Sequence, residues 1–259
     1  MLKEPQISNA ERQTQLLHLI EQQGRASVTE ICEQFSVSLA TARRDLEALA
    51  EQGRVQRVHG GAIAVHKSPP EAPVLLRASE YAEEKERIGQ AAAELVADGE
   101  TIFLGSGTTI LEVARHLRDR RHLTVITNSL LVINTLADCN DLTLISLGGI
   151  FRASEMSFIG HVAEQALAEV RADKVFLGIR AIDLEHGLTN EYLPETMTDR
   201  AILHIGREVI VVADHTKCGC VSAAFVAPLS AMHTLITGAE VNREFAAALT
   251  AQGTRLLTV

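Results

Sequence analysis

A short stretch of glycine and hydroxyl residues has the composition of an anion-binding loop. It comes directly after a β-rich run and opens a helical stretch, so its amides, its hydroxyls and the positive end of the helix would face one ligand. Such an arrangement favours phosphate. The stretch lacks the third glycine of a dinucleotide-binding loop and the Gly-Lys-Ser/Thr of a Walker loop, and the alternative is an ordinary helix-capping turn. Its residues are Gly105, Ser106, Gly107, Thr108 and Thr109.

Three further groups of polar or glycine residues follow β-rich runs in the same part of the chain. These residues are Asn128, Gly148, Gly149, Asp214 and Lys217. The carboxyl ends of parallel strands meet at one edge of a sheet, and ligands of such sheets bind there. We therefore predict one ligand site at this edge, with Lys217 as a cation beside the anion-binding loop. Taken singly, each group is also explained by a turn with helix caps.

Glu195, Asp214 and Lys217 raise the alternative of an enzyme. Two carboxylates and an ammonium group could serve as acid, base and charge stabiliser in an aldose–ketose isomerisation, a reaction that needs paired proton donors and acceptors.

A helix that could read DNA is predicted near the N-terminus. Ser38 is a suitable N-cap, because its hydroxyl can accept from the amide of Thr41, and the helix should begin at Leu39. Arg43 and Arg44 lie about one turn from its start, close to the end that a recognition helix inserts into the major groove. The alternative is a surface helix with two solvated arginines. The expected buried stripe consists of Leu39, Ala42, Leu46, Leu49 and Ala50.

Two helices and a β-ribbon flank this predicted helix. Leucine residues between positions 11 and 24 predict a first helix, and Ser27 and Glu30 have the spacing of a capping box at the start of a short second one. Beyond Gly53 apolar residues alternate on both sides of a glycine turn at His59 and Gly60, which predicts a two-stranded ribbon. Three helices and a ribbon predict a winged helix-turn-helix. A catalyst has no need of such a DNA-reading module, so we expect a regulator and not an enzyme.

The net charge of −9 argues at first against nucleic-acid binding, but the charges are unevenly distributed along the chain. Residues 1–67 contain 8 Lys+Arg and 8 Asp+Glu, so the remaining 16 basic and 25 acidic residues carry the whole −9. Residues 54–67 contain no acid, whereas Arg54, Arg57 and Lys67 are basic. The sequence therefore predicts a modest basic patch on the ribbon.

A proline-rich stretch separates this segment from the rest of the chain. Pro69, Pro70 and Pro73 exclude a helix or a central strand there. The predicted parts are a DNA-binding domain over residues 1–65, a linker over 66–78 and an α/β domain over 79–259.

The C-terminal segment alternates β-rich runs with helical stretches, which predicts an α/β fold with a mainly parallel sheet. A last strand at residues 255–259 should lie at an edge of this sheet. The other predicted strands are 101–104, 123–127, 142–147, 174–179, 209–213 and 233–236.

The apolar pattern and the cysteines indicate a compartment. The longest apolar runs, such as residues 209–213, are far shorter than the roughly 20 residues that span a bilayer, so no membrane contact is expected. Residues 1–9 lack the pattern of a secretory signal, and we expect a cytoplasmic protein. The four cysteines show no zinc-binding spacing and are expected to be reduced thiols, with no metal or cofactor.

The N-terminal segment resembles the DNA-binding domain of DeoR-type bacterial transcriptional regulators. The match runs from Arg12 through the second helix and residues 40–46 to residues 58–62. The resemblance implies that the recognition helix faces DNA and that the ribbon, the wing of the motif, lies along the DNA backbone. The residues assigned to the DNA interface are Ser38, Thr41, Arg43, Arg44, Arg57, His59 and Gly60.

Residues 79–237 resemble the effector domain of the same family, which is related in fold to ribose-5-phosphate isomerases. The resemblance implies a repressor whose DNA affinity is changed by a phosphorylated sugar or a related metabolite, with Glu195 and Arg180 among the effector-binding residues. The family often has lysine at position 199 and a small residue at position 180, whereas this chain has Asp199 and Arg180, which suggests an altered effector. The matching signatures are Asp98-Gly99, 105–109, 126–129, 147–149, 187–189, Glu195, 214–217 and Ile236-Thr237.

The expected partners are double-stranded operator DNA, a phosphorylated sugar or related small molecule, and further copies of the chain. One winged helix makes too few contacts for tight specific binding, so a homo-oligomer, a dimer or a tetramer, is expected. Effector binding would shift the relative placement of two DNA-binding modules. The sequence leaves open the operator, the effector and whether the effector releases or strengthens DNA binding.

Overall fold

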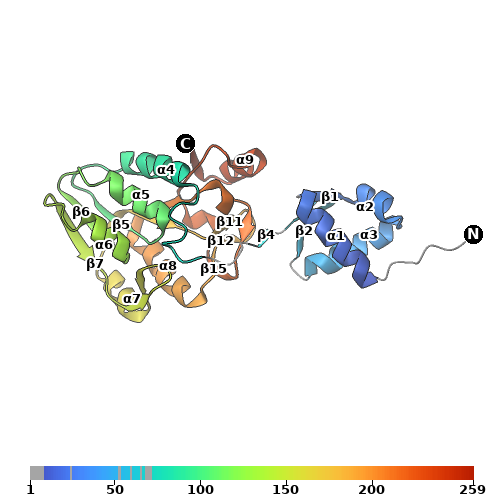
Figure 1. Ribbon diagram of the computed structural model, residues 1–259, viewed down its shortest axis with the longest axis horizontal. Coiled ribbons are helices and arrows are strands. Elements are labelled where there is room, and N and C mark those ends of the chain that lie inside the picture. The colour runs from blue at the N-terminus through green and yellow to red at the C-terminus, as the bar shows by residue number, and fades with distance from the viewer. Residues whose placement is uncertain (1–8, 24, 52–53, 59, 65, 68–71) are drawn as a thin grey trace, which may run out of the picture. The chain divides into compact units, whose positions relative to one another are not determined.

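The computed structural model describes residues 9–23, 25–51, 54–58, 60–64, 66–67 and 72–259. The chain divides into two compact units, Met1–Lys67 and Ser68–Val259, which we call the small unit and the large unit (Figure 1).

Three helices and a three-stranded antiparallel sheet form the small unit, which confirms the predicted winged helix-turn-helix. The sheet has the order β1-β3-β2, so the ribbon β2–β3 is joined by a strand that the sequence did not predict. The elements are α1 (Asn9–Gln23), β1 (Arg25–Ser27), α2 (Val28–Phe35), α3 (Leu39–Glu51), β2 (Val55–Val58), β3 (Gly61–Ala64) and β4 (His66–Lys67).

Side-chain caps fix the starts of α2 and α3, as predicted. The Glu30 amide donates to Ser27 Oγ over 3.2 Å, and the Ser27 amide donates to Glu30 Oε2 over 2.7 Å, which completes a capping box. The Thr41 amide donates to Ser38 Oγ over 3.2 Å. The expected burial of Leu39 is wrong, since it is 57% exposed. It occupies the first position of α3, ahead of the turn at Ala42 where the helix enters the core.

A seven-stranded, wholly parallel sheet forms the centre of the large unit, in the order β17-β16-β13-β10-β5-β6-β7. This confirms the predicted α/β fold and the edge position of the last strand. The strands are β5 (Thr101–Leu104), β6 (Leu123–Thr127), β7 (Leu142–Ser146), β10 (Ala172–Gly178), β13 (Gly206–Val212), β16 (Thr234–Thr237) and β17 (Arg255–Thr258).

Helices cover both faces of this sheet, because successive strand residues point to opposite sides. Ile102 and Leu104 of β5 pack with α4, α5 and α6, whereas Phe103 between them packs with α7, α8 and α9. The sheet is therefore buried between two apolar layers. The helices are α4 (Ala82–Glu94), α5 (Thr108–His116), α6 (Leu130–Leu136), α7 (His161–Ala168), α8 (Leu193–Ile205) and α9 (Arg243–Ala251), with short 3-10 turns η1 (His215–Lys217) and η2 (Leu229–Ala231).

Short strands that the sequence did not predict lie in the loops that follow β7, β10 and β13. One antiparallel sheet has the order β11-β12-β15, and β8 pairs with β9. Each of these strands has only two to four residues, which is too few for a period-two apolar pattern to show. They are β8 (Ile150–Arg152), β9 (Ser157–Ile159), β11 (Ala181–Asp183), β12 (Gly187–Asn190), β14 (Cys220–Val221) and β15 (Ala224–Ala227).

The four cysteines are free thiols, as predicted. Across the part of the chain that the structure describes, we find no helix with both the length and the apolar character needed to cross a membrane.

Close packing of α4 on α5 depends on Gly89. A Cβ atom added there would lie 2.6 Å from Glu112 Cβ and 2.7 Å from the Glu112 carbonyl carbon. We expect Gly89→Ala to lower the free energy of unfolding of the large unit by about 1–3 kcal/mol, because overpacking outweighs the higher helix propensity of alanine. Urea unfolding checks this. Gln90→Ala, on the exposed side of the same helix, should stay within about 0.5 kcal/mol of the wild type. Equal stability of the wild type and Gly89→Ala would contradict the packing argument.

Candidate functional site

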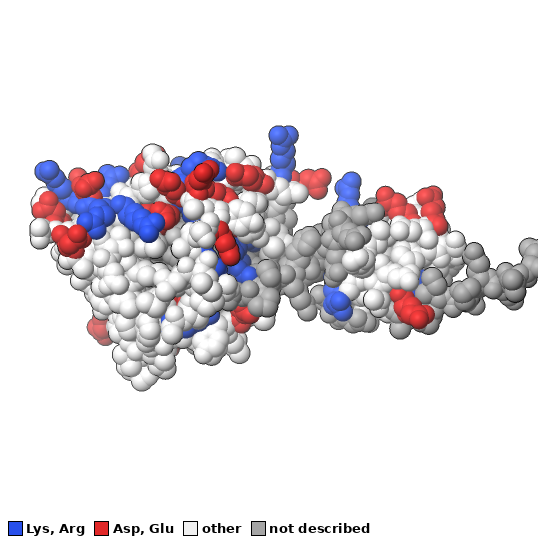
Figure 2. All heavy atoms as spheres, in the orientation of Figure 1, with Lys and Arg blue, Asp and Glu red and all other residues white. Residues whose placement is uncertain are grey.

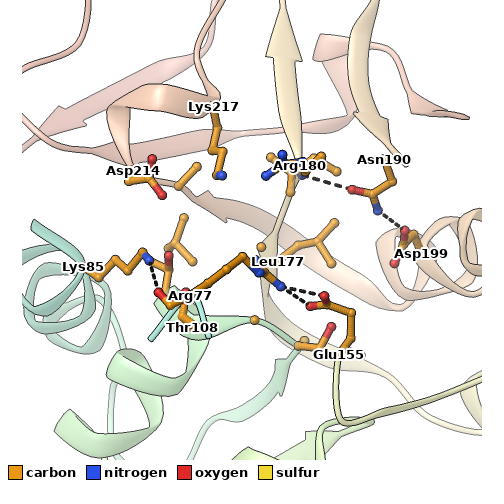
Figure 3. Close-up of a pocket in the computed structure, with 18 of the residues that line it drawn as sticks. Arg77, Lys85, Thr108, Glu155, Leu177, Arg180, Asn190, Asp199, Asp214 and Lys217 are labelled. Carbon is orange, nitrogen blue, oxygen red and sulfur yellow. Dashed lines mark hydrogen bonds and ion pairs between the residues drawn. The ribbon is translucent and has the colours of Figure 1, made fainter. Parts of the chain in front are cut away.

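A pocket lies at the carboxyl edge of the parallel sheet, where the loops after β5, β6, β10 and β13 converge (Figure 3). The structure thus brings together ten of the twelve residues that the sequence assigned to a ligand site, although they are spread over more than a hundred positions. The ten lining residues are Gly105, Ser106, Gly107, Thr108, Thr109, Asn128, Arg180, Glu195, Asp214 and Lys217.

The other two predicted residues, Gly148 and Gly149, are not among the residues that line this pocket. They follow β7, the strand at the far edge of the sheet. Gly149 has a φ of 143°, and a Cβ atom there would lie 2.6 Å from the carbonyl oxygen of Ile159. The structure therefore gives Gly149 a packing role against β9.

The glycine-rich loop has the conformation that an anion-binding helix start needs. Gly107 is the N-cap of α5 and has a φ of 109°, a conformation that residues with a side chain rarely adopt. No side chain caps this end of the helix. The amides of the first turn therefore face the pocket rim without a capping side chain. Thr108 and Thr109 are buried at the same end.

Two buried cations that sequence reasoning missed also line the pocket. Lys85 of α4 is only 4% exposed, and its Nζ donates to the backbone carbonyl of Arg77 over 3.1 Å. Burial lowers the pKa of Lys85, and the charge of Asp214 opposes this effect. Lys85 precedes the buried Ile88 by three positions, so the helical period could have revealed its inward direction.

Arg77 lies within the predicted linker but is buried in the large unit. Its Nη2 lies 2.6 Å from both carboxylate oxygens of Glu155, and its Nε donates to the carbonyl of Ala72 over 2.7 Å. Figure 3 shows its side chain crossing the pocket from the Lys85 side to Glu155. No pattern in the sequence distinguishes this arginine from a solvated linker residue.

A chain of hydrogen bonds forms the opposite side of the pocket. The Arg180 amide donates to Asn190 Oδ1 over 3.0 Å, and Asn190 Nδ2 donates to Asp199 Oδ2 over 2.5 Å (Figure 3). Burial raises the pKa of Asp199 to about 7, although the hydrogen bond from Asn190 opposes the shift. This side of the pocket offers an oriented carboxyl group that changes charge near neutral pH.

Two carboxylates that the isomerase alternative needs are already engaged. Glu195 forms an ion pair with Arg152, whose guanidinium lies 4.6 Å from the ring centre of Tyr192. Asp214 Oδ1 accepts from the amide of Thr216 over 3.2 Å and from its hydroxyl, so it caps the turn η1. Both groups are held in place by neighbours.

Asn128 presents an unused acceptor at the pocket. Its Nδ2 donates to the carbonyl of Phe158 over 3.0 Å, which fixes the orientation of the amide. Its Oδ1 is buried and has no hydrogen-bond partner among the residues that the structure describes. A buried acceptor without a donor is costly, so a ligand hydroxyl at this position would relieve that cost.

Beside the pocket, Glu84, His215 and Glu240 place possible cation-binding atoms within 4.8 Å of one another. Glu84 Oε1 already accepts from the amides of His215 and Gly238, and Glu84 Oε2 lies 2.9 Å from His215 Nδ1. This carboxylate therefore ties α4 to the loops after β13 and β16.

The recognition helix exposes the residues assigned to DNA. Arg43 and Arg44 are exposed, Thr41 is half-buried, and Arg57 of the ribbon donates to the Arg43 carbonyl over 3.1 Å. Gly60 is exposed and has a φ of 87° in the ribbon turn. His59 lies outside the described residues.

Asp45 follows the two arginines directly on α3, and it turns inward, whereas Glu47 is exposed. It is buried and accepts from Arg12 of α1 over 2.6 and 3.1 Å and from Gln13 over 3.2 Å. The arginine that it contacts is thus Arg12 of the first helix, and not one of the two arginines assigned to DNA. Its charge is therefore neutralised on the side away from the exposed arginines.

Asp199 should make the stability of the large unit depend on pH. Its pKa is higher in the folded protein than the ordinary value near 3.9, so the unfolded chain loses its proton first and the free energy of unfolding falls between about pH 4 and pH 7. Asp199→Asn removes this loss. We expect the variant to gain about 1–4 kcal/mol relative to the wild type between pH 4 and pH 8. Urea unfolding at several pH values tests this, and a difference that does not change with pH would contradict it.

Comparisons with known proteins agree with this two-part arrangement. The family model of the DeoR-like helix-turn-helix domain matches residues 12–68, and that of the DeoR C terminal sensor domain matches residues 80–239. The chain has a TM-score of 0.40 to ribose 5-phosphate isomerase A from Methanocaldococcus jannaschii, with 19% identity over 53% of this chain and 55% of that one.

Two curated relatives cover most of the chain. It is 35% identical to the transcriptional repressor AccR of Agrobacterium fabrum over 231 residues, which are 89% of this chain and 90% of that protein. It is 38% identical to the glycerol-3-phosphate regulon repressor of Escherichia coli over 213 residues, which are 82% of this chain and 84% of that protein. With both domain models matched in order, the chain belongs to the DeoR family of DNA-binding transcriptional regulators.

Proposed function

We propose that this chain is a repressor of a carbohydrate-utilisation operon, and that a phosphorylated sugar or related metabolite in the pocket controls its affinity for operator DNA. The pocket itself carries the proposal. Lys85, Lys217 and the start of α5 supply positive charge and amides for a phosphate, whereas Asn128 and Asp199 supply oxygen atoms for hydroxyl groups. The name of the Escherichia coli relative, a glycerol-3-phosphate regulon repressor, is consistent with such a ligand.

In this proposal, α3 reads base edges and the ribbon contacts the backbone. The capped start of α3 projects free of the core, as the exposure of Leu39 and of both arginines indicates. Arg57 links the ribbon to α3 through the Arg43 carbonyl, so the two DNA-contacting elements move together. The proposed DNA contacts are Ser38, Thr41, Arg43, Arg44, Arg57, His59 and Gly60.

We also propose that the protein acts in the cytoplasm as a homo-oligomer. The large unit exposes several large apolar side chains, and Figure 2 shows a face around α7 with few charged groups. Apolar side chains that gather on a surface commonly mark protein contacts. The exposed residues include Ile150, Phe151, Val162, Leu193, Met197 and Phe225.

The isomerase alternative has less support. Glu195 is paired with Arg152, and Asp214 caps a turn, so neither carboxylate is arranged as a general base poised for a substrate proton. The curated relatives reported above are named as regulators. We therefore propose that the pocket binds its ligand without converting it.

Replacing Arg43 and Arg44 together by alanine should abolish the operator shift. Each arginine that reads a base or neutralises a phosphate contributes roughly 1–3 kcal/mol, so the pair corresponds to a loss of at least about 30-fold in affinity. Gel-shift and filter-binding assays measure this at one fixed salt concentration. The double variant should keep the ligand-induced rise in melting temperature of the wild type. Retained operator binding would show that α3 is not the recognition helix.

Lys217→Ala should do the reverse, keeping DNA binding but weakening the ligand about 10- to 100-fold, because a charge-assisted hydrogen bond is worth about 1.5–3 kcal/mol. A thermal-shift screen of phosphorylated sugars identifies ligands, since a ligand that binds only the native state raises the melting temperature. An unchanged response in Lys217→Ala would contradict the phosphate site. Isomerase turnover in the wild type that disappears in this variant would support the enzyme instead.

A further inference from the structure

The segment that leads out of the small unit forms part of the pocket wall. Val74 is buried, and its amide donates to the Ser154 carbonyl over 2.7 Å in the loop between β8 and β9. Arg77 pairs with Glu155 one position further along that loop. Residues 72–77 are thus tied to the large unit at two successive points of one loop.

Two of the pocket cations hold this same segment. Arg77 holds it through its side chain, and Lys85 holds it by donating to the Arg77 backbone carbonyl. Both cations line the cavity in which the phosphate of the proposed ligand would lie. An anion cannot approach them without changing the forces on residues 72–77.

We propose that Arg77 carries the ligand signal to the DNA-binding unit: an anionic ligand draws its guanidinium away from Glu155 and so weakens the attachment of residues 72–77. This inference rests on the proposed function of the pocket. It adds Arg77 and Glu155, which no motif assigned, as the residues that convert occupancy into a change in the chain between the two units.

The geometry of the ion pair favours such an exchange. Arg77 Nη2 lies 2.6 Å from both oxygens of Glu155, while Nε donates to the Ala72 carbonyl. One nitrogen shared between two oxygens of the same carboxylate bends both hydrogen bonds away from the straight geometry in which they are strongest. A phosphate dianion beside it attracts Arg77 more strongly than one carboxylate does, and it repels Glu155.

The same anion acts on the second attachment. Lys85 Nζ binds only a neutral carbonyl in this segment, so a phosphate offers it a stronger, charge-assisted hydrogen bond. Both side-chain attachments therefore weaken together on ligand binding. The backbone bond from Val74 to Ser154 involves neither cation, so the Val74 amide can report on the segment.

A direct test measures amide hydrogen exchange in the full-length protein, with inorganic phosphate as the probe and chloride at matched ionic strength as the control. We expect phosphate to speed exchange of the Val74 amide by about tenfold, because local opening becomes easier. A thermal shift measured in parallel shows whether phosphate binds. If phosphate binds and the exchange of Val74 is unchanged or slower, the inference is wrong while the pocket assignment stands.

Glu155→Gln tests the competition itself. Without the carboxylate, phosphate should bind roughly 3- to 10-fold more tightly, and Val74 should exchange fast before phosphate is added. The DNA affinity of this variant without phosphate should equal that of the wild type with phosphate, whichever direction the wild type responds in. A variant that keeps the full phosphate response of both Val74 and DNA binding would overturn the inference.

Glu86→Gln is the matched control. Glu86 is exposed on α4 and loses the same charge on substitution, but it is not among the residues that line the pocket. We expect the Val74 amide of this variant to exchange, and the variant to respond to phosphate, as in the wild type. If Glu86→Gln behaves like Glu155→Gln, the loss of one acidic charge and not the Arg77 pair is responsible. Absence of phosphate binding in the wild type, or binding that Lys217→Ala leaves intact, would instead overturn the proposed pocket and this inference with it.

Discussion

Burial of cations at the carboxyl edge of the parallel sheet is the constraint on which the large unit depends. A buried ammonium or guanidinium group is stable only when neighbouring oxygen atoms replace the water that it has lost. Here Glu155 supplies them for Arg77, and the Arg77 carbonyl together with the charge of Asp214 supplies them for Lys85. The cations of the pocket are therefore already paired, and any anion that enters must compete with those pairs.

The parallel order of the sheet explains why these groups meet. Each strand enters from the same side, so the loops after β5, β6, β10 and β13 leave together although the chain between them is long. Thr108, Asn128, Arg180 and Asp214 each follow a different strand. Apolar helices on both faces hold the strands, and the loops at the edge are left to carry the polar chemistry.

The sequence was sufficient to predict features that depend only on residues close together in the chain. The hydroxyl of Ser38, the Ser27–Glu30 box and the glycine loop around Gly107 depend on residues a few positions apart, and each appears in the structure where it was predicted. The predicted burial of Leu39 was wrong because the helical period indicates which way a side chain points, but not how far the neighbouring core extends along the helix.

The residues that the sequence missed depend on tertiary contacts. Arg77 and Glu155 are 78 positions apart, and the linker prolines gave no reason to expect a buried arginine after them. Asn190 and Asp199 gain their roles from the burial of Asp199 and from the Arg180 amide that fixes Asn190. No spacing rule relates such groups, because the fold brings them together through the order of the strands.

The free energy that couples two sites in an allosteric protein is similar in size to the free energy of one ion pair. Allosteric coupling between two sites is typically about 1–3 kcal/mol, or a change of roughly 5- to 150-fold in affinity. The interaction free energy of a buried arginine changes by about this amount when its partner changes from a carboxylate to a phosphate. In the small unit, residues 1–67 carry equal numbers of acidic and basic residues, so DNA affinity there rests on a few exposed cations and not on a strong overall field. In the proposed mechanism, a modest change in the chain that joins the two units is then enough to alter how those cations reach the operator.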